Sequence, residues 1–138
     1  MKLLKYGKDG GAKSTVSGFW LVEIKSLFSI VILRFDKGSR EMYHSHAFNA
    51  ITWFLKGRVT EHHLMSEDLE WGASWKPKYT PRSCFHKVYA HEVTYALCIR
   101  GPWSKTWSDY DPKSKQLLEY SWGRKIKKVT LLELTSSE

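Results

Sequence analysis

The sequence predicts an all-β protein, built either as a two-sheet sandwich or as a barrel. About ten short runs rich in β-branched and aromatic residues follow one another along the chain. Glycines and prolines separate these runs at short intervals, and no run has the length and periodicity of a convincing helix. With 138 residues, the chain is expected to form one domain over residues 1–138, because two cores would leave too few residues for each.

The first half of the chain is expected to begin with a loop-like segment, residues 1–18, because glycines crowd the stretch after Tyr6. Lys56-Gly57 has the form of a tight turn between two strands. The strands expected in this half are residues 19–24, 27–35, 42–48, 50–55 and 58–64.

The second half opens with residues 66–72, which are polar and acidic and are expected to form a loop. Residues 79–81 are expected to form a bend, because Pro81 follows two β-forming residues. The strands expected after this bend are residues 85–89, 93–100, 117–122 and 125–134. For the last of these a short amphipathic helix is the alternative.

The charge balance favours anionic ligands. The chain has 22 lysines and arginines against 14 acidic residues, a formal net charge of +8. Basic residues are dense only at 124–128, so a nucleic-acid polymer is not the expected partner. No stretch approaches the roughly 20 apolar residues of a membrane span, and the N-terminus lacks the apolar region of a signal peptide. A cytoplasmic location without membrane attachment is therefore expected, with Cys84 and Cys98 as unpaired, buried thiols.

Three histidines are the main candidates for a functional site. His44 and His46 alternate within an expected strand, so both side chains project from the same face and can grip one metal ion. His86 follows Pro81 by five residues on a later strand. Simple packing or hydrogen bonding is the alternative interpretation of the His-x-His pair.

The spacing around these histidines resembles the two sequence motifs of the cupin superfamily. The positions that match are Gly38, His44, His46 and Gly57 in the first motif, and Pro81 and His86 in the second. The resemblance implies a cupin-type β-barrel, also called a double-stranded β-helix or jelly roll. It also implies a metal site made by His44, His46 and His86.

Three positions depart from the cupin pattern. Ala50 stands where the first motif has a glutamate, and Ser83 and Ala90 replace the glycine and the asparagine of the second. The implied ligand set is therefore three histidines without a carboxylate, as in thiol dioxygenases. Over about residues 20–122 the sequence is also similar to small bacterial and phage cupin-like proteins, a group to which we can attach no settled activity.

A three-imidazole site suits Fe, Zn, Ni or Cu, and the sequence does not select among these metals. Around it we expect catalytic roles for His62, which has a carboxylate neighbour, and for Asn49, near the lost glutamate position. The candidates for binding an anionic substrate are Arg82, Arg100, Trp53 and Lys87.

Three functional classes remain open on this basis. The first is a small metal-dependent enzyme acting on a small anionic molecule, with a three-histidine Fe(II) dioxygenase as its specific form. The second is a phage-type hydrolase, such as a phosphodiesterase, or a sequestering binder of a cyclic nucleotide signal in the host cytoplasm. The third is a binding module whose site has decayed. The apolar segment 27–35 is in addition a candidate surface for a homodimer.

Overall fold

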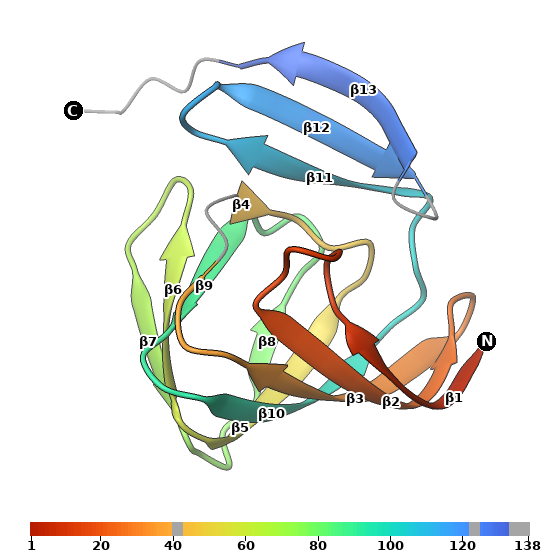
Figure 1. Cartoon of the computed structure of the whole chain (residues 1–138), viewed down its shortest axis with the longest axis vertical. Helices are drawn as coiled ribbons and strands as arrows, with labels where there is room; N and C mark the ends of the chain where they lie inside the picture. The colour runs from red at the N-terminus through yellow and green to blue at the C-terminus, as the bar shows by residue number, and fades with distance from the viewer. Residues whose placement is uncertain (40–42, 122–124, 133–138) are drawn as a thin grey trace.

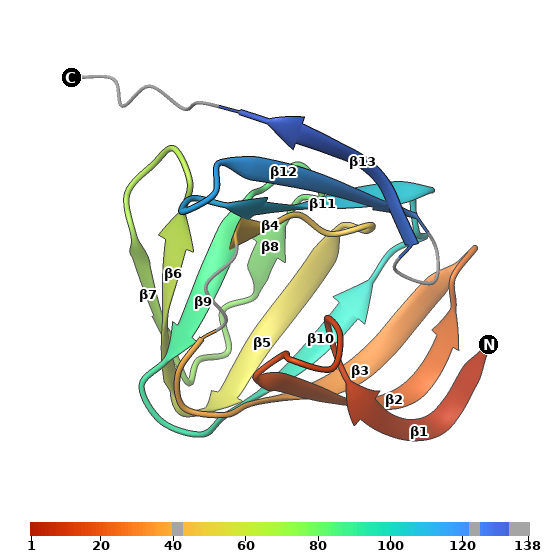
Figure 2. The same cartoon turned by 45° about the horizontal axis from the view of Figure 1, so that its top comes forward.

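The protein consists of two antiparallel β-sheets that face each other (Figures 1 and 2). A computed structural model describes residues 1–39, 43–121 and 125–132, and these contain strands and no helix. Met42, Trp122 and the last two residues of the expected strand 125–134 lie outside the described residues. The all-β prediction is confirmed, and residues 125–131 form a strand instead of the alternative helix.

The first sheet has six strands. Their spatial order is β1 (Lys2–Lys8), β2 (Val16–Ile24), β3 (Phe28–Phe35), β10 (Thr94–Arg100), β5 (Ala50–Lys56) and β8 (Lys78–Thr80). Strand β10 pairs with β3 on one side and with β5 on the other, so segments distant in the sequence form the middle of the sheet.

The second sheet has seven strands. Their spatial order is β13 (Lys125–Leu131), β12 (Gln116–Ser121), β11 (Thr106–Asp111), β4 (Tyr43–His44), β9 (His86–Ala90), β6 (Arg58–His63) and β7 (Leu69–Gly72). The two-residue strand β4 joins β11 to β9 within this sheet.

Alternation along the strands decides what enters the space between the sheets. In β10, Ala96 and Cys98 are buried, whereas Tyr95 and Ile99 are exposed on the opposite face. Most of the buried hydrophobic side chains form one cluster, which includes Val31 and several aromatic rings. Every second residue of such a strand therefore points into the space between the sheets, where it meets either the hydrophobic cluster or the cavity described below.

Three expected loop segments are strands in the structure. Residues 2–8 pair with β2 as strand β1, although residues 1–18 were expected to be loop-like. Residues 69–72 and 78–80 likewise form the edge strands β7 and β8. All three carry polar residues and are held by pairing with a neighbouring strand, which local propensity does not reveal.

The turn at Gly57 is confirmed between β5 and β6, with Gly57 at a φ of 97°. Cys84 and Cys98 are both free thiols, as expected, although only Cys98 is buried. Among the described residues, no helix is long and apolar enough to cross a membrane.

Candidate metal centre

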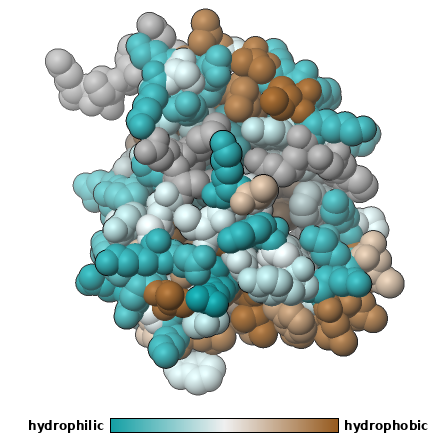
Figure 3. Space-filling view, viewed as in Figure 1, coloured by the Kyte–Doolittle hydropathy of each residue, from teal (hydrophilic) through white to brown (hydrophobic). Residues whose placement is uncertain are grey.

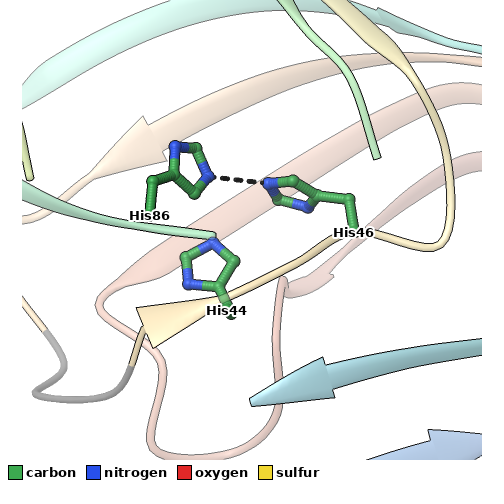
Figure 4. A group of neighbouring side chains, drawn as sticks. All are labelled: His44, His46 and His86. Atoms are coloured by element: carbon green, nitrogen blue, oxygen red, sulfur yellow. Dashed lines mark hydrogen bonds between the residues drawn. The ribbon is translucent and has the colours of Figure 1, made fainter. Parts of the chain in front are cut away.

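The three histidines of the motif meet between the two sheets, although 40 residues separate His46 from His86. His44 lies on β4 and pairs directly with His86, the first residue of β9, while His46 follows β4 by two residues. One ligand atom from each ring lies within 4.8 Å of the others. Figure 4 shows the rings converging on a common point.

The geometry of this group fits a metal ion. His46 Nε2 and His86 Nε2 face each other at 2.9 Å. Two nitrogens bound to one metal at about 2.1 Å and at right angles would be about 3.0 Å apart. A donor set of neutral imidazoles suits Fe, Zn, Ni or Cu. The residues present could therefore hold a divalent transition-metal ion, whose identity the donor set leaves open. Without an ion, the same 2.9 Å contact is a hydrogen bond between the two rings.

A buried carboxylate orients one of these histidines. Glu61 on β6 has a side chain 1% exposed, and its Oε2 lies 2.5 Å from His86 Nδ1. Because Nδ1 donates its proton to this carboxylate, the lone pair of His86 Nε2 points toward the other histidines. A carboxylate behind a histidine ligand in this way fixes its tautomer and its ring orientation.

The same carboxylate has two further partners. Lys78 Nζ lies 2.5 Å from Glu61 Oε2, and His63 Nε2 lies 2.7 Å from Glu61 Oε1. His63 Nδ1 is 3.5 Å from the Sγ atom of Cys84. These contacts satisfy a charge that would be costly to bury alone.

The charges of this network shift three pKa values. Burial alone would raise the pKa of Glu61, but the hydrogen bonds from His86 and Lys78 and the positive charge of Lys78 hold it well below its usual value. Burial lowers the pKa of His86 and outweighs its bond to Glu61, which favours the neutral ring that binds metals. Burial and the Glu61 charge raise the pKa of the Cys84 thiol.

The histidines border a cavity of about 380 Å³ between the sheets. Five cationic side chains line it against three carboxylates, together with several aromatic rings. The ring of Phe48 stacks on His46 with centroids 5.1 Å apart, and the Arg100 guanidinium lies 4.6 Å from the Phe48 centroid. One aromatic ring thus lies between the metal-binding group and a buried arginine.

Arg100 is the one predicted anion-binding residue that lines this cavity. Its side chain is 3% exposed, and Nη2 donates to Asp9 Oδ2 at 2.6 Å. Burial would lower the pKa of Arg100, but the Asp9 carboxylate raises it above its ordinary value, so the guanidinium remains charged.

Asn49 and Arg82 are placed at the surface, and neither lines the cavity. The Asn49 side-chain oxygen accepts a hydrogen bond from the backbone N–H of Arg82 at 2.8 Å. The Asn49 carbonyl oxygen accepts another from Gly101. Asn49 therefore fastens two loops together, which corrects its expected catalytic role.

Three other predicted site residues face away from the cavity. Trp53 lies on β5 between the inward positions Thr52 and Phe54, and strand alternation puts its ring on the outer face. Lys87 lies over the ring of Tyr43, outside the cavity lining. His62 Nδ1 pairs with Asp68 at 2.9 Å, on the face of β6 opposite to Glu61. The roles expected for them in the site are therefore corrected.

The sequence argument missed Glu61 and Lys78. Alternation along β6 contains the signal for the first, because Glu61 and His63 share a face from which His62 is excluded. The expected set of three histidines contained no carboxylate. In the structure a carboxylate is nevertheless close by, because Glu61 hydrogen-bonds to the Nδ1 atom of His86, on the side of the ring away from the other histidines. Lys78 lies on β8, which was expected to be a bend, so nothing pointed it inward.

Solved structures with the same arrangement of strands are cupins. A sugar phosphate isomerase of the cupin superfamily from Silicibacter pomeroyi matches with a TM-score of 0.64 at 11% identity, covering 95% of this chain and 92% of its own. An RmlC-like cupin from Shewanella frigidimarina matches with a TM-score of 0.54 at 14% identity, covering 69% and 81%. The chain has the cupin fold.

A third match is ectoine synthase from P. lautus, with a TM-score of 0.57 at 14% identity, covering 70% of each chain. No family model matches the sequence, and no curated protein matches it either. Identities this low establish the fold alone, so the chemistry of this protein has to be argued from its own site.

Proposed function

We propose that this cupin is a metal-dependent enzyme that acts on a small anionic molecule, with His44, His46 and His86 as metal ligands. The observation that carries the proposal is the facing pair of Nε2 atoms, 2.9 Å apart, with Glu61 behind His86. A packing role for the histidines would explain their burial. It would give no reason for a buried carboxylate that selects the metal-binding tautomer of His86.

A bound metal would supply Lewis-acid activation of a substrate oxygen or of water, or redox chemistry toward dioxygen. Two residues of the chain orient the histidine ligands for such a metal. Glu61 keeps the proton of His86 on Nδ1, and Lys78 balances the carboxylate charge so that it stays ionised in a buried position. Aromatic rings form part of the cavity wall beside the histidines.

The anionic character of the substrate follows from the charges lining the cavity, where cationic side chains outnumber carboxylates. Among the proteins with the same fold, one is a sugar phosphate isomerase, and its substrate class is a small phosphorylated molecule. We extend that class to this cupin only as far as a small molecule with a carboxylate or phosphate group. Oxidative chemistry at iron, as a three-histidine dioxygenase, is the specific form that we propose to assay first.

A nucleotide ligand is the second candidate, favoured by the aromatic lining of the cavity. Trp20, Trp71, Trp103 and Trp107 all contribute to the cavity surface, and indole faces stack on planar bases. In this alternative the protein would hydrolyse or sequester a cyclic nucleotide, and binding would persist after metal removal. Thermal stabilisation by nucleotides in the presence and absence of a chelator separates the two candidates.

The first experiment is elemental analysis of the full chain, purified without a metal-affinity tag and compared with a His86→Ala variant. We expect close to one equivalent of iron, zinc, nickel or copper in the wild type and its loss in the variant. His62→Ala is the matched control, because this histidine faces away from the cavity and pairs with Asp68. Equal metal content in all three proteins, or none in the wild type after growth in supplemented medium, would overturn the proposal.

A further inference from the structure

Four buried N–H donors of the cavity lining have no acceptor among the described residues. They are the indole Nε1 groups of Trp20, Trp71 and Trp103 and the Nε group of Arg100. A buried donor without an acceptor destabilises a protein, and folded proteins hold few such groups. All four belong to residues that line the cavity, so small shifts of these side chains would turn the donors toward a ligand that presents hydrogen-bond acceptors.

The arginine among these donors determines the chemistry of that ligand. A guanidinium offers a planar fork that matches the two oxygens of a carboxylate or phosphate. In Arg100 one arm of this fork, Nη2, is bonded to Asp9, and Cys98 is a further hydrogen-bond partner of the guanidinium, while Nε has no acceptor. The residue is thus charged, buried and only partly satisfied.

Asp9 presents to Arg100 the same functional group that such a ligand would carry. It lies just after β1, in the connection between β1 and β2 that turns back between the two sheets (Figure 2). Gly10 and Gly11, with φ values of 96° and 98°, form the turn that follows. The Asp9 side chain is 28% exposed, whereas that of Arg100 is 3% exposed, so the carboxylate approaches from the open side.

We propose that Arg100 binds the carboxylate or phosphate group of the substrate, and that Asp9 occupies this position until the ligand replaces it. The prediction that an anionic group of the ligand binds Arg100 does not depend on the metal. The prediction that the other end of the ligand binds the metal rests on the proposed function. Phe48 lies between Arg100 and His46. The substrate class is therefore a small molecule with an oxyanion at one end and a metal-binding oxygen at the other, separated by about one ring.

This arrangement makes Asp9 an internal competitor. Each incoming anion has to separate the Asp9 carboxylate from Arg100, and it thereby exchanges one charge-assisted hydrogen bond for another. Replacement of Asp9 by asparagine keeps the size of the side chain and removes its charge. We expect the Asp9→Asn protein to bind anions about tenfold more tightly, because a neutral amide holds the guanidinium more weakly than a carboxylate does.

The test is isothermal titration of the metal-free full chain with inorganic phosphate and with succinate, which distinguish a phosphate from a carboxylate preference. Asp68→Asn is the matched control, since it removes an equal charge from the outer face, where Asp68 pairs with His62. The expected result is tighter binding by Asp9→Asn than by both wild type and Asp68→Asn. Arg100→Lys, which keeps the charge but loses the fork, should bind at least tenfold more weakly than the wild type.

The outcomes separate this inference from the proposed function. Asp9→Asn affinities equal to those of the wild type, or a matching gain in Asp68→Asn, would overturn the role of Asp9. Because Asp9→Asn leaves Arg100 in place, it provides a test even if Arg100→Lys fails to fold. Tight anion binding by Asp9→Asn together with unchanged metal content in His86→Ala would leave the inference standing and reject the metal site.

Discussion

The carboxylate of Glu61 is a single buried group that serves both the metal-binding histidine and the surrounding fold. It accepts from His86, His63 and Lys78, so it fixes three side chains at once. Because carboxylates that support histidine ligands raise metal affinity without touching the metal, Glu61 is a positioning residue here.

Replacement of Glu61 by glutamine tests this role. Glutamine offers one uncharged oxygen where Glu61 offers two charged ones to His86, His63 and Lys78. The hold on the His86 tautomer therefore weakens, and metal affinity should fall about 10–100-fold. Competition against a chromogenic chelator measures the change. Glu70→Gln is the control, because Glu70 is an exposed acid on the neighbouring strand whose partners are Thr60 and His91. Equal losses in both variants would contradict the role of Glu61.

Sequence reasoning at the residue scale succeeds where a motif fixes the spacing and fails where side-chain direction decides. The motif brings His44, His46 and His86 together as predicted, with one ring nitrogen of each within 4.8 Å of the others. Arg82 and Trp53 were chosen for their chemistry alone, and their strands or loops turn them outward. Arginine and tryptophan have equally good surface and interior uses, so the choice between those uses needs the fold.

At the scale of elements, the turn between β5 and β6 is the most restrictive local feature. Gly57 has a φ of 97°, and a Cβ atom built on it would meet the Thr94 side chain and lie 2.7 Å from Thr94 Cα. Both the backbone conformation and the contact with β10 therefore require glycine.

The pair Gly57→Ala and Gly38→Ala separates these two requirements. Gly38 also has a positive φ, 107°, but a Cβ there would meet nothing within 4 Å. We expect Gly38→Ala to cost about 1–2 kcal/mol of unfolding free energy from backbone strain alone, and Gly57→Ala about 3–5 kcal/mol. Urea unfolding followed by tryptophan fluorescence measures both. A similar loss in the two variants would show that Thr94 adjusts freely.

The strands that were predicted correctly have a clear pattern in their own sequence, whereas the strands that were missed do not. Strands β5 and β6 have alternating or β-branched residues and a glycine turn between them, and their existence and order are confirmed. Strands β1, β7 and β8 all lie at sheet edges and pair with one neighbour each, and most side chains of β1 and β7 are exposed. Their conformation comes from hydrogen bonds to the adjacent strand, which the local sequence does not encode.

At the scale of the whole molecule, the outer face of the six-stranded sheet is apolar over its middle strands. Cross-strand pairing aligns two apolar rows on this face: Ile30, Ile99, Ile51 and Tyr79 in the first, and Phe19, Ile32, Leu97 and Trp53 in the second. Figure 3 shows hydrophobic residues gathered at the lower right of the view, where Figure 1 has β1, β2 and β3 of this sheet.

This face predicts a symmetric dimer of the chain. The two rows cross five strands, which at about 4.8 Å spacing make a face roughly 20 Å wide. The rows carry no charged residue to match a charged partner, and a two-fold axis would pair each row with its own copy.

Sedimentation velocity measures this association. We expect the wild type to form dimers and Ile99→Lys to remain monomeric, because a lysine in the apolar row would be buried without a partner charge. Ile126→Lys is the control, since Ile126 is exposed on β13 of the other sheet. A wild-type chain that remains monomeric at the highest concentration measured would contradict the prediction.

The two-residue strand β4 connects the parts of the seven-stranded sheet. On one side of it lie β11, β12 and β13, on the other β9, β6 and β7, and His44 belongs to β4 itself. A ligand that ties His44 to His86 across this narrow junction would restrain local opening of the sheet. Amide hydrogen exchange in β11 and β12 would then slow when the metal binds, so a change at the histidines would be recorded as protection far from them.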